Sequence, residues 1–217
     1  MRTGRFITFE GGEGSGKSTQ ARKLAERLRA EGRDVLLTRE PGGSPFAEQV
    51  RGLLLGGTLA PHPPIAEALL FSAARADHLA SAIRPALATG RWVICDRFAD
   101  STRVYQGAAG GVAEAELDAL ERLVVGPTSP NLTLILDIEA RAGLARATTR
   151  REAIEGSEID PFESRALAFH ETLRAGYLEI ARREPQRCVV VDARAEAEAI
   201  AAQIWKLVAE RLEPGRA

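Results

Sequence analysis

The sequence predicts an α/β fold in which a five-stranded parallel sheet is covered by helices on both faces. Three observations support this prediction. Five short apolar runs recur along the 217 residues, helical patterns separate them, and a glycine-rich turn follows the first run. Parallel strands need crossover connections, and helical crossovers cover both faces of the sheet. Residues 1–217 contain no repeat or linker and correspond in length to one domain, so we expect a single domain.

The predicted strands are apolar runs that end beside polar or charged residues. Ligands of an open parallel sheet collect at the carboxyl ends of its strands, so we expect the site at that edge. The five strands are Phe6–Phe9, Val35–Leu37, Trp92–Cys95, Leu132–Leu136 and Cys188–Val191. Their ends carry Glu10, Arg39, Glu40, Asp96, Arg97, Asp137 and Asp192.

Most of the chain between the predicted strands has the apolar periodicity of helices. After the glycine-rich turn, apolar residues at i, i+3, i+4 and i+7 form one face of a helix that Gly32 is positioned to end. A proline inside a helix removes a backbone donor, so we expect a disturbance at Pro85. The apolar face of the first helix carries Ala21, Leu24, Ala25 and Leu28, and that of the second carries Phe46, Val50, Leu53 and Leu54. The further predicted helices span residues 65–89, 114–125, 162 or 163 to 183, and 196–212.

The turn after the first strand matches the phosphate-loop pattern: a glycine, four free positions, then Gly-Lys-Ser. The glycines at 11, 12, 14 and 16 allow positive φ, which directs backbone N–H groups at a triphosphate. Lys17 can reach the β and γ phosphate oxygens, and the Ser18 hydroxyl can bind Mg²⁺ beside the N-terminus of the following helix. The pattern predicts a nucleotide phosphate site made of Gly11, Gly12, Glu13, Gly14, Ser15, Gly16, Lys17, Ser18 and Thr19.

A nucleotide enzyme also needs an acidic residue beside its magnesium ion. Two predicted strands end in an apolar run followed by aspartate, at Asp96 and at Asp137, and the pattern alone does not choose between them. Arg97 directly follows Asp96 and could bridge substrate phosphates. This neighbour favours Asp96.

Composition bears on partners and location. The chain has 29 basic and 30 acidic residues and a net charge of −1, so we expect no nucleic-acid partner and no anionic membrane partner. No apolar run approaches the roughly 18 residues of a membrane span, and the first strand begins near the first residue, so we expect a cytoplasmic protein.

Cys95 and Cys188 are predicted to be reduced core residues. His62, His78 and His170 lack metal-ligand spacing and are interpreted as structural or exposed.

Four motifs follow one another along the chain: GGEGSGKST at 11–19, TREPGG at 38–43, FSAAR at 71–75 and DRFADSTRVYQG at 96–107. The first is shared by many families, but the set resembles the thymidylate kinase family, bacterial type, among the nucleoside monophosphate kinases. The resemblance implies a P-loop NTPase fold with a small mobile lid at about 141–163. It also implies phosphorylation of dTMP to dTDP for dTTP biosynthesis, ATP as the phosphate donor, Mg²⁺ as the cofactor, and a homodimer.

In the acceptor half of the site, the resemblance implies that Arg97 and Arg51 bind the dTMP phosphate with help from Arg39. Phe71 would stack on thymine and Arg75 would hydrogen-bond its O4 edge. The set is completed by Glu40 beside the deoxyribose, Thr102 and Gln106 at the base, and Tyr105 where a ribose 2′-hydroxyl would lie. Without the resemblance, Phe71 would be interpreted as a core residue and the arginines as solvated helix charges.

In the donor half, the resemblance implies that Lys17 holds the ATP phosphates while Ser18 and Asp96 serve the metal. The lid would close over ATP, exclude water and deliver arginines. The acidic Glu13 fits bacterial forms in which the lid carries the arginines. Similar lids often read Asp-Arg-x-Glu, whereas this chain reads Asp160, Pro161, Phe162 and Glu163, so the catalytic arginine must come from earlier in the lid. The candidates are Arg150 and Arg151 at the phosphate and Arg146 near adenine.

Phosphoryl transfer requires alignment and charge neutralisation more than a strong base, because the acceptor phosphate is already an anion. Arginines and magnesium should therefore matter more than histidines. Two alternatives remain open: a kinase of another nucleoside monophosphate or of a deoxynucleoside, and a nucleotide-binding switch without turnover. The acceptor residues argue against the first, and the lack of an Asn-Lys-x-Asp signature argues against the second.

Overall fold

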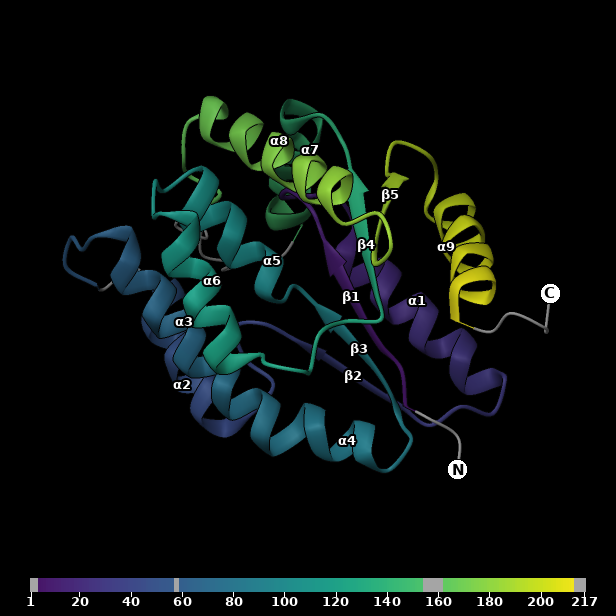
Figure 1. Cartoon of the computed structure of the whole chain (residues 1–217). Helices are drawn as coiled ribbons and strands as arrows, with labels where there is room; N and C mark the ends of the chain where they lie inside the picture. Colours follow the sequence, from purple (N-terminus) through teal and green to yellow (C-terminus); the bar gives the residue numbers. More distant parts are fainter. Residues whose placement is uncertain (1–3, 57–58, 154–161, 213–217) are drawn as a thin grey trace.

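The computed structural model describes residues 4–56, 59–153 and 162–212, and within them it contains one five-stranded, all-parallel sheet (Figure 1). The strand order is β2-β3-β1-β4-β5, which places β1 at the centre. Every strand includes the polar residue that was predicted to follow its apolar run. The strands are β1 (Phe6–Glu10), β2 (Val35–Arg39), β3 (Trp92–Asp96), β4 (Leu132–Asp137) and β5 (Cys188–Asp192).

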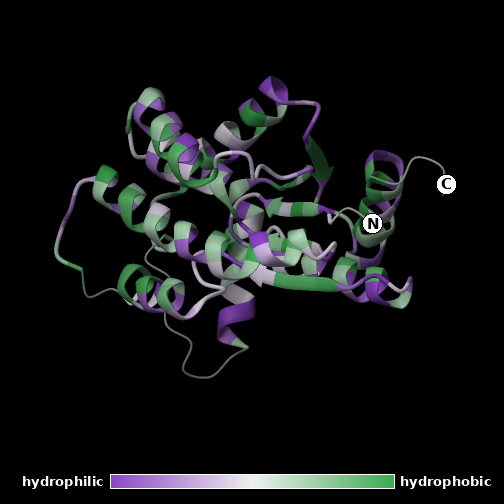
Figure 2. Cartoon of the chain, turned by 60° about the horizontal axis from the view of Figure 1, so that its bottom comes forward, coloured by the Kyte–Doolittle hydropathy of each residue, from purple (hydrophilic) through white to green (hydrophobic). Residues whose placement is uncertain are grey.

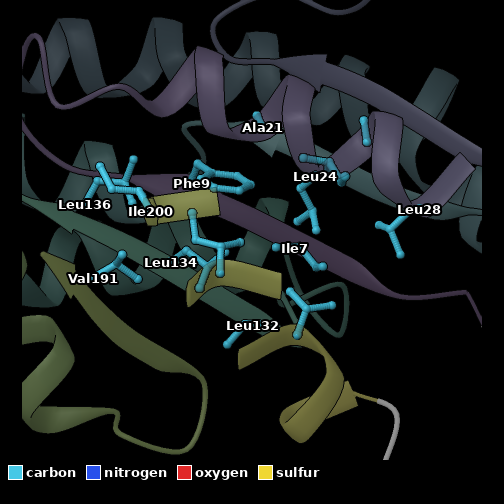
Figure 3. Packing of buried hydrophobic residues seen from close by; sticks show 14 of the residues in the cluster. Ile7, Phe9, Ala21, Leu24, Leu28, Leu132, Leu134, Leu136, Val191 and Ile200 are labelled. Atoms are coloured by element: carbon cyan, nitrogen blue, oxygen red, sulfur yellow. The ribbon is translucent and has the colours of Figure 1, made fainter. Parts of the chain in front are cut away.

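Helices cover both faces of the sheet, as predicted. On one face, α1 (Lys17–Ala30) and α9 (Ala197–Leu212) pack against each other and against the strands. Figure 3 shows side chains of the central strands meeting side chains of these two helices, among them Phe9, Leu134, Leu24 and Ile200. The opposite face is covered by α4 (Arg84–Ala88), α5 (Ala99–Thr102) and α8 (Leu167–Arg183).

The long predicted helix at 65–89 is one continuous run of three segments: α3 (Pro64–His78), a π-helical turn η1 (Leu79–Ile83) and α4. The expected disturbance is therefore present, but it lies just before Pro85 rather than at it. A proline cannot donate to the preceding turn, and its ring crowds the carbonyl four residues earlier, which here belongs to Ser81. The wider π turn accommodates that clash.

Two other predicted helices form α2 (Pro45–Leu55), which packs against α3, and α6 (Glu114–Val124). The periodicity did not predict α5, the π-helical η2 (Arg103–Ala108) that continues it, or α7 (Ala140–Glu152). In α7 only Gly143 and Ala147 are buried, so its amphipathic signal is weak. The Asp160 and Pro161 of the predicted lid lie outside the described residues.

The distribution of apolar residues agrees with this layering. Figure 2 shows apolar strands in the interior and helices that carry both apolar and polar residues. Cys95 and Cys188 are buried and not disulfide-bonded, as predicted. Within the described parts of the chain, no helix is long and apolar enough to cross a membrane.

Candidate active site

A cavity of about 360 Å³ lies at the carboxyl ends of the strands, where the sequence predicted a site. It is lined by most of the predicted residues: Glu13, Gly14, Gly16, Lys17, Ser18, Thr19, Arg39, Glu40, Arg51, Phe71, Arg75, Asp96, Arg97, Thr102, Tyr105, Gln106 and Arg150. The predicted residues outside this lining are Gly11, Gly12, Ser15, Arg146 and Arg151. The lining also includes residues that carried no predicted role: Pro41, Leu55, Phe98, Ser101, Phe162 and Glu163.

The phosphate loop uses three of its four predicted glycines for positive φ. Gly11, Gly14 and Gly16 have φ of 134°, 64° and 92°. Gly12 is not among the positive-φ residues, so that expectation was wrong for this position. Its carbonyl oxygen instead accepts hydrogen bonds from Lys17 Nζ at 2.7 Å and Ser15 Oγ at 2.9 Å, which fixes both side chains inside the loop.

The phosphate loop and α7 touch backbone to backbone. A Cβ atom on Gly14 would lie 1.9 Å from the carbonyl oxygen of Gly143, and a Cβ on Gly143 would lie 2.4 Å from the carbonyl oxygen of Glu13. Only glycine at both positions permits this approach. The contact sets the first turn of α7 directly on the loop, a relationship that periodicity could not predict because it joins residues far apart in the sequence.

Lys17 is buried against the loop with 7% of its surface exposed. Burial and the nearby Arg97 lower its pKa to about 8, although the carboxylates of Glu13, Asp96 and Glu10 act in the opposite direction. The ammonium group is therefore held between one guanidinium and three carboxylates at the base of the loop.

The two candidate metal aspartates differ in their partners. The Ser18 hydroxyl donates to Asp96 Oδ2 at 2.5 Å, so these two predicted metal ligands lie together. Asp137 instead accepts two hydrogen bonds from the Arg174 guanidinium, at 2.7 and 2.9 Å. Among the described residues, no group of three or more His, Cys, Asp or Glu side chains could hold a metal alone. A cation at Ser18 and Asp96 would need oxygens from a ligand and from water, which suits Mg²⁺.

Arg97 has an unusual backbone conformation, and its side chain is hydrogen-bonded on both terminal nitrogens. Its φ is 69°, in the left-handed region that non-glycine residues rarely adopt. Its Nη2 donates to Glu13 Oε1 at 2.6 Å, and its guanidinium lies 5.1 Å from the centre of the Tyr105 ring. The Tyr105 hydroxyl donates to the same Glu13 oxygen at 2.7 Å.

Glu13 is strongly ionised in this environment. Burial alone would raise its pKa, but the charges of Arg97 and Lys17 and the Tyr105 hydrogen bond lower it to about 2. The loop carboxylate, predicted only as an acidic free position, thus forms the centre of a charged cluster at the cavity wall.

Among the predicted acceptor residues, Arg75 and Glu40 form a buried ion pair, with Arg75 Nε donating to Glu40 Oε2 at 2.7 Å. Arg75 Nη2 donates to the Phe98 carbonyl oxygen and to Thr102 Oγ1. The other Glu40 oxygen lies 3.1 Å from His78 Nδ1. Arg75 is therefore buried and oriented, rather than a solvated helix charge.

The remaining predicted acceptor residues differ in how firmly they are held. Arg51 Nη1 donates to the Pro41 carbonyl oxygen at 2.8 Å, and Gln106 Nε2 donates to Glu67 at 3.1 Å. Arg39 pairs with Glu48 at 3.2 Å, and more than half of its side chain is exposed. These contacts leave Arg39 on the outer part of the lining.

Three aromatic side chains meet in the cavity. The ring of Phe162 lies 5.4 Å from that of Tyr105 in an edge-on arrangement and 6.4 Å from that of Phe71. Phe162 follows the part of the predicted lid that lies outside the described residues. The sequence analysis placed Phe162 in the predicted lid and as a possible start of α8, but α8 begins at Leu167, and nothing in the periodicity indicated that Phe162 would meet Phe71 and Tyr105.

None of the three histidines, which were predicted to be structural or exposed, lines the cavity. His78 is fully buried and bridges Glu40 and Thr38, and His62 contacts Ala60 and Glu67. His170 is 4% exposed, and both of its ring nitrogens lack a hydrogen-bond partner in the described structure. The structural interpretation therefore holds for His78.

The arginines of α7 have separate partners. Arg146 donates to the backbone carbonyl oxygens of Ala193 and Arg194, after β5. Glu163 pairs with Arg151 at 2.9 Å and with Arg150 at 3.5 Å. Only Arg150 of these three lines the cavity.

Comparison with known proteins identifies the family. The family model described as Thymidylate kinase matches residues 9–204. The chain is 58% identical over 212 residues to a thymidylate kinase of Caulobacter vibrioides, with 98% of this chain and 99% of the relative covered. It is 53% identical to one of Rhodopseudomonas palustris, with 96% and 90% covered. A crystal structure of a thymidylate kinase from Ehrlichia chaffeensis superposes with a TM-score of 0.77 at 33% identity, covering 95% of this chain and 99% of that one. The chain belongs to the thymidylate kinase family.

Proposed function

We propose that this chain transfers the terminal phosphate of ATP to the phosphate of dTMP and so produces dTDP for dTTP biosynthesis. The observation that carries the proposal is one cavity lined both by the phosphate loop and by the acceptor residues of the family motifs. A donor site and an acceptor site that open into the same space allow direct transfer between two bound nucleotides.

In the donor half, the loop N–H groups and Lys17 bind the β and γ phosphates. Ser18 and Asp96 are the residues that would hold Mg²⁺, and their hydrogen-bonded oxygens fit a hard cation that keeps several waters. When bound, the ion supplies charge neutralisation at the phosphate oxygens. Since Asp137 is engaged by Arg174, Asp96 is the better candidate.

In the acceptor half, Arg97 and Arg51 bind the dTMP phosphate, and the exposed Arg39 assists from the outer lining. Arg75, oriented by Glu40, donates to the O4 edge of thymine. Phe71 stacks on the base, while Tyr105 excludes a ribose 2′-hydroxyl; Thr102, Gln106 and Glu40 complete the contacts to the base and sugar. Buried and hydrogen-bonded side chains of this kind make the acceptor pocket rigid before the substrate arrives.

The α7 segment supplies the arginines of a lid, within one domain that spans the chain. Arg150 lines the cavity, and Arg150 and Arg151 both form ion pairs with Glu163. When these ion pairs break, both arginines can reach the transferring phosphate. An arginine that neutralises the transferring phosphate contributes about 10³ to 10⁵ in rate. Arg146 donates to the Ala193 carbonyl oxygen after β5, outside the cavity lining, and we assign it to the adenine of ATP.

We also propose a homodimer through the outer face of α3 and α6. Leu69 and Leu123 are 53% and 82% exposed, and an exposed apolar patch that continues around such residues marks an interaction surface. Small exposed residues continue each stripe: Ala73, Ala76 and Ala80 after Leu69, and Ala115 and Ala119 before Leu123. Because α3 and α6 pack side by side, these stripes form one apolar surface that a second copy would cover.

The test is an assay of the purified chain with ATP, Mg²⁺ and a panel of acceptors: dTMP, dUMP, CMP, GMP and thymidine. We expect dTMP to be used far better than CMP, GMP or thymidine. Equal turnover of dTMP and CMP or GMP would contradict the proposal. Weak dUMP activity would not, since one methyl group in an apolar pocket discriminates by only about 10- to 200-fold.

The relatives described above all carry the name thymidylate kinase, which gives no support to another acceptor. Tight nucleotide binding without transfer to any monophosphate would indicate the switch alternative instead. A cytoplasmic location remains a prediction from the sequence.

A further inference from the structure

We infer that Tyr177 and Ser101 are positioning residues for Arg97, joined in a hydrogen-bond relay that ends at the buried carboxylate of Glu10. The relay holds one nitrogen of the Arg97 guanidinium and leaves the other directed toward the acceptor phosphate. This inference rests on the proposed function, in which Arg97 binds the phosphate of dTMP.

The relay has one consistent direction of donation. Arg97 Nη1 lies 3.1 Å from the Tyr177 hydroxyl and 3.3 Å from Ser101 Oγ. Burial raises the pKa of Glu10 to about 7, so at pH 8 Glu10 is mostly ionised and its Oε2 accepts from Ser101 Oγ at 2.6 Å, which uses the single proton of that hydroxyl. The Tyr177 hydroxyl, 2.9 Å from Ser101 Oγ, must therefore donate to Ser101 and accept from Arg97. Burial also raises the pKa of Tyr177 well above its ordinary value, so the hydroxyl keeps its proton.

The relay is shielded from water. Tyr177 is 1% exposed and Glu10 is 0% exposed, and the second Glu10 oxygen accepts the Phe98 backbone N–H at 2.8 Å. Tyr177 comes from α8, which packs on β4 and β5, so its hydroxyl is fixed by an element that does not belong to the phosphate loop or to the β3 motif. Hydrogen bonds in such surroundings orient a charged group more firmly than exposed ones do.

The two guanidinium nitrogens of Arg97 thus have different surroundings. Nη1 donates to Tyr177, Ser101 and the Gly11 carbonyl oxygen, all of which are parts of the folded frame. Nη2 donates to Glu13 at the cavity wall. An acceptor phosphate can replace or join Glu13 at Nη2 while Nη1 stays in place. The strained backbone of Arg97, with φ of 69°, also fixes the direction of its Cα–Cβ bond and so restrains the side chain further.

The test is a double-mutant cycle that uses the dTMP kinase assay at pH 8. Tyr177→Phe keeps the ring and removes only the hydroxyl. We expect kcat/KM for dTMP to fall about tenfold, the value of one hydrogen bond to a charged group, with KM for ATP unchanged. In an Arg97→Lys background, which lacks the Nη1 donor, the same change should have no further effect. Ser101→Ala is the second variant and should give a loss that is not additive with that of Tyr177→Phe.

Thr8→Val is a matched control, because it removes a buried hydroxyl bonded to Thr133 outside the relay, and it should leave kcat/KM for dTMP unchanged. An equal loss from Tyr177→Phe in the wild-type and Arg97→Lys backgrounds would overturn the inference, because the hydroxyl would then act without Arg97. An unchanged kcat/KM in a folded Tyr177→Phe variant would overturn it as well. A wild-type chain that fails to phosphorylate dTMP would instead overturn the proposed function, so the two failures are distinguishable.

Discussion

Glu13 Oε1 lies 2.6 Å from Arg97 Nη2, which joins the phosphate loop to the first residue after β3 through one ion pair. Both side chains are mostly buried, at 15% and 17% exposed. The pKa of Glu13 is lowered to about 2: burial raises it, but the charge of Arg97 outweighs that effect together with Lys17 and Tyr105. A lowered carboxyl pKa means that the folded state favours the ionised form, so the pair stabilises the fold above the pKa of the unfolded chain.

Glu13→Gln should therefore lower the free energy of unfolding at pH 7, by on the order of 3 kcal/mol if the full shift applies. The difference in unfolding free energy from wild type should shrink as the pH falls from about 4.5 toward 2. In this range the Glu13 carboxylate of the unfolded wild-type chain binds a proton while that of the folded chain stays ionised, which favours unfolding of the wild type. Urea unfolding at several pH values measures this. Glu179→Gln is the control, because Glu179 is a solvent-exposed partner of Arg182 and Arg183 and should have little effect. A pH-independent difference for Glu13→Gln would contradict the ion-pair account.

ATP binding should take up a proton through Lys17. Its pKa of about 8, lowered by burial and by Arg97, leaves the amine about half protonated at pH 8 in the ligand-free protein. The triphosphate favours the charged form, so binding at pH 8 should take up about half a proton, and much less at pH 6.5. Isothermal titration calorimetry in buffers of different ionisation enthalpy measures the uptake. Lys17→Arg stays charged and should bind without it; an uptake that persists in this variant would assign the proton to another group.

The strands and the location of the site were predictable from local sequence. Apolar runs identify β1 to β5, and the rule that ligands collect at the carboxyl ends of parallel strands brought Asp96 and Arg39 to the same edge, where they are register partners. The phosphate loop was predictable because its glycines and Lys17 form one contiguous motif. Its φ values were less so, as Gly12 shows.

What the sequence could not predict depends on contacts between distant segments. The sequence favoured Asp96 over Asp137 as the metal candidate, but it could not show that Asp96 contacts Ser18 whereas Asp137 pairs with Arg174. The α5–η2 region was missed because its short helical turns carry a polar motif rather than an apolar period. Tyr177 gave no local signal either, since its hydroxyl meets Arg97 only after α8 packs on the sheet.

Asp96→Asn should impair magnesium use far more than Asp137→Asn. The first change weakens an oxygen ligand that lies beside Ser18, whereas the second disturbs a pair with Arg174. We expect Asp96→Asn to lower kcat at least 100-fold, by about 3 kcal/mol of transition-state stabilisation, and to raise the Mg²⁺ concentration for half-maximal rate. Magnesium titrations of both variants with saturating ATP and dTMP measure this, and chelation should abolish wild-type transfer. If Asp137→Asn shows the larger shift, the metal ligand has been assigned to the wrong strand.

Gly143→Ala should damage the donor half although alanine favours helices. In an open helical position the change would stabilise the fold by roughly 0.5–1 kcal/mol. At Gly143, however, the new Cβ would lie 2.4 Å from the Glu13 carbonyl oxygen, and a backbone atom can move only if the phosphate loop or α7 shifts. Overpacking of this kind costs about 1–3 kcal/mol, so a net loss of stability is expected.

Gly52→Ala in α2 is the matched control, because its Cβ would meet nothing within 4 Å. It should leave the KM for ATP unchanged and keep or raise the Tm. Gly143→Ala should lower the Tm and raise the KM for ATP, since the displaced loop no longer presents its N–H groups in the bound geometry. Thermal unfolding and initial rates at varied ATP distinguish the two variants. If both behave alike, α7 can yield without moving the loop, and the contact between Gly14 and Gly143 has no part in holding the donor site.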